Sequence, residues 1–154
     1  MSLKVDLQLA VRDESIPDKE KFQLWADAAA DVCRCDNMAL TIRVTDTVES
    51  AELNDRYRNK PGPTNVLSFP FEDPPGQETN ILGDLVVCAP VVQKEAGEQH
   101  KSSDAHWAHM LVHGVLHLCG YDHIDQSGAD EMESLETGII TRLGFPPPYE
   151  EQKL

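Results

Sequence analysis

Hydrophobic and polar residues alternate along two stretches of the chain, residues 3–11 and 38–45. A period of two is typical of a strand that buries one face, so each stretch predicts a strand. Residues 64–71 and 81–90 are short apolar runs bounded by proline, glycine and polar loops. We expect them to form two further strands that pair as neighbours.

About five other segments carry apolar residues at helical spacing. In the first of them, Phe22, Trp25, Ala29 and Val32 recur every three or four positions after Pro17. The predicted helices cover residues 18–33, 46–58, 90–100, 104–119 and 126–143.

The fourth predicted helix has recognisable ends. Ser102 or Ser103 can cap its N-terminus, and Gly120 can adopt the left-handed conformation that ends a helix. Four strands and about five helices in mixed order predict a single α+β domain over residues 1–154, with a mixed four-stranded sheet. The tail after about residue 146 is expected to fray.

Composition indicates where in the cell the protein is found and whether it binds a membrane. No apolar run approaches the roughly 20 residues of a membrane helix. The N-terminal segment also lacks the apolar stretch and cleavage site of a signal peptide, so we expect a cytoplasmic protein without a membrane partner. The four cysteines are scattered and form no CxxC pair, which predicts reduced, mostly buried thiols.

The charge of the chain is strongly acidic but unevenly distributed. A net charge of −14 disfavours broad attraction to nucleic acid, because phosphate binding depends on lysine and arginine. Arg56, Arg58 and Lys60 nevertheless fall within five residues, whereas residues 122–136 carry six carboxylates and no lysine or arginine. A polyanion could therefore bind locally, at the basic cluster.

Three histidines lie within residues 113–123, HGVLHLCGYDH. His113 and His117 are one helical turn apart, which lets both imidazoles reach one ion. Gly120 can turn the chain back so that His123 supplies a third ligand. Three imidazoles with an open fourth position describe a catalytic zinc site, although nickel, cobalt or copper would also suit them. We expect one such ion per chain, at the end of a central helix.

The residue after His113 is a glycine, which disfavours one class of zinc enzyme, the peptidases. The spacing H-x-x-x-H-x-x-G-x-x-H is that of the metzincin proteases except at Gly114, where those enzymes place a glutamate as general base. A peptidase is therefore the weakest hypothesis. Zinc lowers the pKa of bound water toward ~7, which suits cleavage of a phosphodiester without a neighbouring glutamate.

Two further histidines share the helix face of His113 and His117. Either His106 or His109 could serve as a ligand, but we expect His106 to line the cleft and His109 to be a proton shuttle or substrate contact. Asp122 can orient an imidazole or cap the last helix.

The histidine motif, together with PTNVLSFPF and LGDLVV upstream, resembles the YbeY family of bacterial rRNA maturation factors, which are metal-dependent, single-strand endoribonucleases. The likeness runs over nearly the whole chain, from LNDRYRNKPGPTNVLSFPF to MESLETGIITRLGF. It implies a zinc-dependent endoribonuclease that acts on single-stranded RNA in rRNA maturation, at the 3′ end of 16S rRNA, and in ribosome quality control. The implied partners are rRNA and the ribosome or small-subunit proteins, not DNA.

The resemblance also assigns roles to individual residues. It implies three zinc ligands, His113, His117 and His123. Arg58 matches a functional arginine in the cleft near the metal, where it can stabilise charge on phosphate oxygens. Lys60 and Ser68 are the further residues expected to contact substrate.

A second hypothesis is a ribosome-assembly or adaptor protein whose metal is mainly structural. The absence of a carboxylate at Gly114 and the acidic charge are both consistent with it. Chelation that abolishes activity and leaves the fold intact would favour the nuclease, whereas chelation that unfolds the domain would favour the adaptor.

Overall fold

The computed structural model describes residues 2–121 and 125–149, which form four strands and five helices. The strands are β1 (Lys4–Leu9), β2 (Ala39–Thr45), β3 (Val66–Pro70) and β4 (Ile81–Cys88). The helices are α1 (Lys19–Cys33), α2 (Thr47–Arg58), α3 (Ala89–Glu98), α4 (Ser103–Leu118) and α5 (Gln126–Arg142). The predicted α+β domain with a four-stranded mixed sheet and five helices is confirmed.

The strands form one sheet in the order β1-β2-β4-β3. The β1–β2 and β2–β4 pairs are parallel, whereas β3 runs antiparallel to β4. The apolar runs at residues 64–71 and 81–90, which form β3 and β4, were expected to pair. This pairing is confirmed, with Ser68 opposite Leu85. Since β3 is an edge strand, the segment that follows α2 passes along one border of the sheet.

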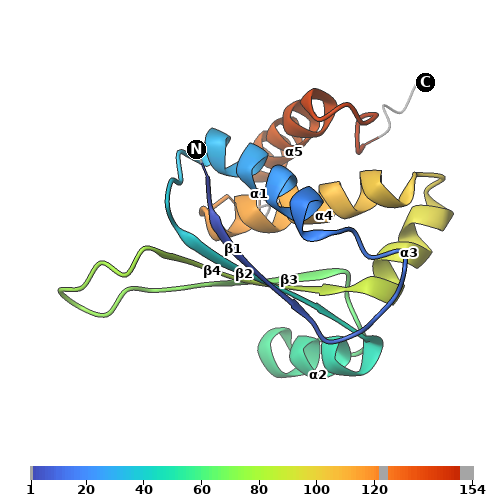
Figure 1. Ribbon diagram of the computed structural model, residues 1–154, viewed down its shortest axis with the longest axis horizontal. Helices are drawn as coiled ribbons and strands as arrows, with labels where there is room; N and C mark the ends of the chain where they lie inside the picture. Colours follow the sequence, from blue (N-terminus) through green and yellow to red (C-terminus); the bar gives the residue numbers. More distant parts are fainter. Residues whose placement is uncertain (1, 122–124, 150–154) are drawn as a thin grey trace.

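Helices cover the sheet unequally. Helices α1, α4 and α5 lie on one face and α2 lies on the other (Figure 1). The core fills the space between the sheet and α4, where Ile42, Leu85, Trp107 and Leu111 are fully buried. Phe22 of α1 packs edge-to-face on Trp107, with ring centroids 5.7 Å apart, so α1 and α4 pack against each other on this face of the sheet.

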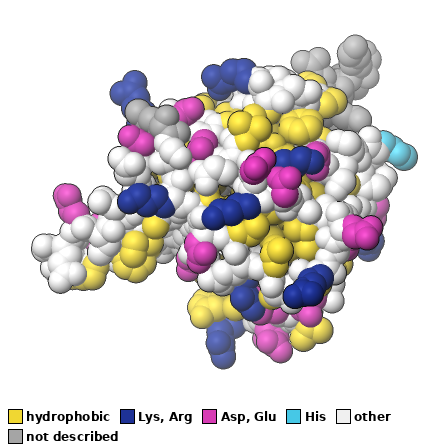
Figure 2. Space-filling view, viewed as in Figure 1, with side chains coloured by type: hydrophobic (Ala, Val, Ile, Leu, Met, Phe, Trp, Pro, Cys, Tyr) yellow, Lys and Arg dark blue, Asp and Glu magenta, His cyan; other side chains and the backbone are white. Residues whose placement is uncertain are grey.

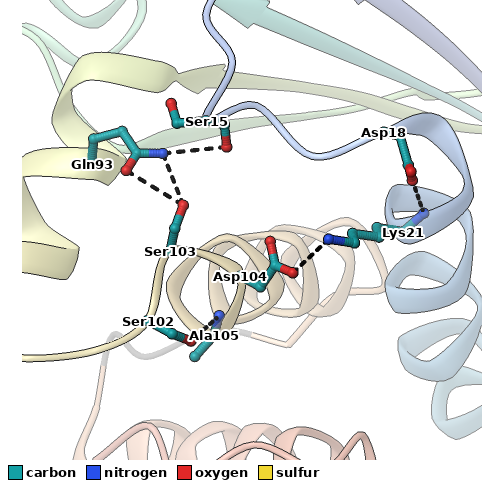
Figure 3. Close-up of polar contacts among 8 residues, drawn as sticks. All are labelled: Ser15, Asp18, Lys21, Gln93, Ser102, Ser103, Asp104 and Ala105. Atoms are coloured by element: carbon teal, nitrogen blue, oxygen red, sulfur yellow. Dashed lines mark hydrogen bonds and ion pairs between the residues drawn. The ribbon is translucent and has the colours of Figure 1, made fainter.

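The first turn of α4 is fixed by side chains from three elements (Figure 3). Ser102 caps the helix by accepting a 3.2 Å hydrogen bond from the backbone N–H of Ala105, as one of the two expected caps. Lys21 of α1 forms a 2.7 Å ion pair with Asp104, and Gln93 of α3 donates to the Ser103 hydroxyl at 3.0 Å. Burial along the helix and polar contacts at its start therefore give α4 a defined position.

The C-terminal part of the described chain consists of α5 and a segment that contacts the loop between α3 and α4. Asp125 caps α5 by accepting from the N–H of Gly128, whereas Asp122, a cap that the sequence allows, lies outside the described residues. Lys101 donates to the carbonyl oxygen of Pro148 at 2.9 Å, and Pro148 is buried. We expected fraying after about residue 146, but Pro148 makes this contact; residues 150–154 lie outside the described part. Within that part, no helix is long and apolar enough to cross a membrane.

Candidate active site

Four histidines form a row along one side of α4. The centroids of neighbouring rings lie 6.0 Å apart for His106 and His109, 6.3 Å for His109 and His113, and 4.7 Å for His113 and His117. His106 and His109 are buried, while His113 and His117 are partly exposed. The two motif histidines thus lie close together at the accessible end of the row, where an ion could reach both.

The buried carboxylate of Glu136, on α5, contacts two histidines of this row, His109 and His113. Its Oε1 accepts a hydrogen bond from Nδ1 of His113 and lies 3.6 Å from Nε2 of His109, and its Oε2 accepts from the Tyr149 hydroxyl at 2.5 Å. Burial alone raises the pKa of Glu136, but the interactions with His109 and His113 outweigh it and lower the pKa to about 2. Glu136 is therefore an ionised acceptor at neutral pH.

This carboxylate determines the tautomer of His113. Because an ionised oxygen can only accept, the proton of a neutral His113 ring resides on Nδ1 and the lone pair on Nε2. Histidines that bind metals commonly donate their second N–H to a carboxylate in this way. Burial raises the pKa of Tyr149, as does Glu136, so the Tyr149 hydroxyl remains a donor to the same carboxylate.

His106 and His109 have different surroundings. Nε2 of His106 contacts Oε1 of Glu95 at 2.9 Å, and the same oxygen accepts from Asn65 at 3.0 Å. Within the described residues, no acceptor or donor lies within hydrogen-bond distance of either ring nitrogen of His109, and the nearest contact given for its Nε2 is Oε1 of Glu136 at 3.6 Å. Burial lowers the pKa of His109, which keeps the imidazole neutral at neutral pH. His109 can therefore exchange a proton with another group. In His106, by contrast, Nε2 is already engaged with Glu95.

A cavity of about 600 Å³ opens beside this row. Its walls include Asn65, Glu95, His109, His113 and Tyr149. A group bound in the cavity would meet the neutral ring of His109 and one ring of the metal motif.

Gly114 has a packing role that the motif alone did not indicate. A Cβ at this position would lie 2.7 Å from Cδ2 of Leu85, a fully buried residue of β4. The hydroxyl of Ser68 donates to the carbonyl oxygen of Gly114 at 3.4 Å, so β3 also contacts α4 here. Glycine therefore lets α4 approach the sheet, and a side chain at this position would point into the core.

The other predicted site residues lie elsewhere. Arg58 ends α2, Lys60 follows it after a left-handed turn at Asn59 (φ 54°), and both side chains are exposed. Neither makes a side-chain hydrogen bond or ion pair within residues 2–121 and 125–149. Ser68 contacts α4, whereas Tyr57, which precedes Arg58, packs on Phe69 of β3 with ring centroids 5.2 Å apart. The end of α2 therefore lies beside β3, and α2 lies on the sheet face opposite α4 (Figure 1).

The described residues show no metal site. His123 lies outside them, and no group of three or more His, Cys, Asp or Glu side chains among the described residues is arranged to hold a metal ion. Glu136 is the residue that sequence reasoning missed. It lies 23 residues after His113 in an acidic stretch, where only its burial distinguishes it from solvated carboxylates.

Charge on the surface is mixed. On the face seen in Figure 2, lysine and arginine side chains are interspersed with aspartate and glutamate and do not form one continuous basic patch. With a net charge of −14, attraction of a polyanion depends on local groups of cations.

Comparison with known proteins agrees with the fold. The solution structure of TM1509 from Thermotoga maritima, also described as VT1, matches with a TM-score of 0.59 and 20% sequence identity over 99% of both chains. At this identity the likeness shows a common fold. A sequence model of the family described as "Endoribonuclease YbeY" matches residues 8–144. The chain therefore belongs to the YbeY family of endoribonucleases.

Proposed function

We propose that this protein is a zinc-dependent, single-strand-specific endoribonuclease of the cytoplasm that acts in rRNA maturation. The specific substrate is the 3′ end of 16S rRNA, with a further role in ribosome quality control, and the partners are the ribosome or small-subunit proteins. The observation that carries the proposal is the ionised, buried Glu136 bonded to Nδ1 of His113, beside the ring of His117, in a chain of this family.

His113, His117 and His123 are the residues that would hold one zinc ion. The fit rests on two features of the described residues, namely the 4.7 Å between the rings of His113 and His117 and the carboxylate that directs Nε2 of His113 toward an ion. A zinc ion there would supply positive charge to phosphate oxygens and activate water.

The chain's own groups would then handle substrate and protons. His109, neutral and with only the 3.6 Å contact to Glu136 within the described part of the chain, would exchange a proton with a group in the cavity. Arg58 and Lys60 would bind phosphates of the RNA strand, and Ser68 would line its path along the β3 edge. A single strand is flexible enough to pass around this edge from α2 to α4.

A direct test uses protein without a histidine tag and one RNA sequence, presented as a single strand and as a duplex. We expect cleavage of the single strand, its loss on chelation with an unchanged circular dichroism spectrum, and its return on addition of zinc. Absence of cleavage by zinc-loaded protein would contradict the proposal.

The adaptor function is the second candidate, favoured by the acidic net charge and the mixed surface in Figure 2. It predicts that zinc-loaded protein binds ribosomal small subunits without cleaving RNA, and that chelation unfolds the domain. Both measurements can be made on the same preparation.

A further inference from the structure

Three of the four cysteines lie together where helices α1 and α4 end. Cys33 and Cys35 lie at the end of α1, and Cys119 caps the C-terminal end of α4. The Sγ atoms of Cys35 and Cys119 are 3.3 Å apart although 84 positions separate these residues in the chain. The thiol of Cys33 also interacts with that of Cys119.

The backbone turns that end the helices hold these thiols in place. Arg34 is left-handed (φ 56°), and the N–H of Cys35 bonds back to the carbonyl oxygen of Ala30 at 3.1 Å. The N–H of Cys119 bonds to the carbonyl oxygen of Val115 at 3.0 Å. The Cys35–Cys119 contact is therefore part of the packing of α1 against α4 rather than a meeting of two free loops.

The geometry suits covalent bond formation. A disulfide is about 2.05 Å long, so the two sulfurs need to approach by only about 1.3 Å. All three clustered cysteines are residues of intermediate burial at the margin of the core, where a small oxidant needs to cross little packing to reach them. Cys88 is buried instead and makes no thiol–thiol contact within the described residues.

We propose that Cys35 and Cys119 form an oxidation site that takes hydrogen peroxide or an organic hydroperoxide and closes to a disulfide. One thiol attacks a peroxide oxygen, the O–O bond breaks, and a sulfenic acid forms with release of water or alcohol. The second sulfur then displaces the sulfenic hydroxyl, which leaves as water, and the S–S bond forms. The two thiols together lose two electrons and two protons, which reduce the peroxide.

The bond would join the end of α1 to the turn that follows His117. Cys119 lies two residues beyond this histidine, and Gly120 (φ 98°) continues the turn. An external thiol would reverse the bond by exchange. The inference concerns only the thiols and does not depend on the proposed nuclease activity.

Trypsin distinguishes the candidate products, because Arg34 separates Cys33 from Cys35. Full-length protein is treated with hydrogen peroxide, alkylated under denaturing conditions, digested and analysed by mass spectrometry. We expect the peptide that begins at Cys35 to be linked to the peptide that begins at Ser102 and contains Cys119. Cys33 and Cys88 should remain alkylated, and reduction should restore alkylation of the linked pair.

Serine variants provide the controls. Cys88→Ser and Cys33→Ser should retain the link, whereas Cys119→Ser should abolish it and leave Cys35 open to alkylation after the peroxide is removed and the protein reduced. Cys35→Ser provides the same readout should Cys119→Ser fail to fold. A link between Cys33 and Cys119, a link between two chains, or full alkylation of both proposed partners after peroxide treatment would overturn the proposal.

Discussion

Helices α2 and α4 lie on opposite faces of the same sheet and present their polar groups in opposite ways (Figure 1). Most residues of α4 are buried, and its histidines contact Glu95, Glu136 or each other. Helix α2 buries only Ser50 and Asn54, which bond to the loop that leads to β3, and its terminal Arg58 is exposed. The polar contacts of the α4 histidines can therefore be described in the isolated protein. A role for Arg58 can be tested only by its effect on a bound polyanion.

The strongest test of α4 removes the proposed metal ligands. We expect the double variant His113→Ala, His117→Ala to lose its zinc and all RNA cleavage, because two of three imidazoles are gone. Elemental analysis of protein purified without a tag measures the zinc. The exposed His100→Gln variant controls for adventitious binding at surface histidines. Full zinc content in the double variant would refute the ligand assignment.

Arg58 tests the other side of the comparison. We expect Arg58→Ala to slow cleavage by ~10²-fold or more, because a contact to transition-state charge is lost. Arg58→Lys should also lose activity, since an ammonium cannot reproduce the planar pair of donors. Zinc content and melting temperature should stay unchanged, because the side chain is exposed and bonds to no described residue.

The same change at another exposed arginine, Arg12→Ala, is the matched control. If Arg58→Ala cleaves RNA as fast as the parent while the histidine variants do not, phosphate is bound by Lys60, Arg56 or backbone amides.

Glu136 sharpens the comparison within α4. We expect Glu136→Gln to weaken zinc binding by about 10- to 100-fold, because a neutral amide no longer fixes the His113 tautomer. Competition with a chromophoric chelator measures this affinity. Glu133→Gln, exposed on the same helix, should bind zinc like the parent. An unchanged affinity in a folded Glu136→Gln protein would show that the buried carboxylate serves only the fold.

Features that depend on local pattern were predictable from the sequence, and those that depend on packing were not. The alternation of apolar residues indicated β1 and β2, and the choice of Ser102 or Ser103 as cap indicated within one residue where α4 begins. The sheet order brings β4 between β2 and β3, which no single segment reveals. Glu136 and the Cys35–Cys119 pair illustrate the same limit, because both arise only where distant segments pack.

Gly114 provides the last test, with the smallest expected effect. Its packing role, like the role of Glu136, could not be predicted from the motif. An alanine here favours the helix by about 1 kcal/mol but forces a Cβ to within 2.7 Å of Leu85 in a fully packed core. Overpacking of this kind costs about 1–3 kcal/mol, so we expect Gly114→Ala to lower the free energy of unfolding by roughly 1 kcal/mol.

Gly138→Ala is the matched control in the interior of α5, where the nearest neighbouring atom lies 3.9 Å from the new Cβ. The change adds helix propensity without a clash, and we expect it to stabilise the protein by about 0.5–1 kcal/mol. Urea unfolding of both variants, monitored by circular dichroism, measures the two effects against one parent. If the two alanines stabilise the protein equally, Leu85 moves aside at no cost, and the close approach of α4 to the sheet does not require glycine.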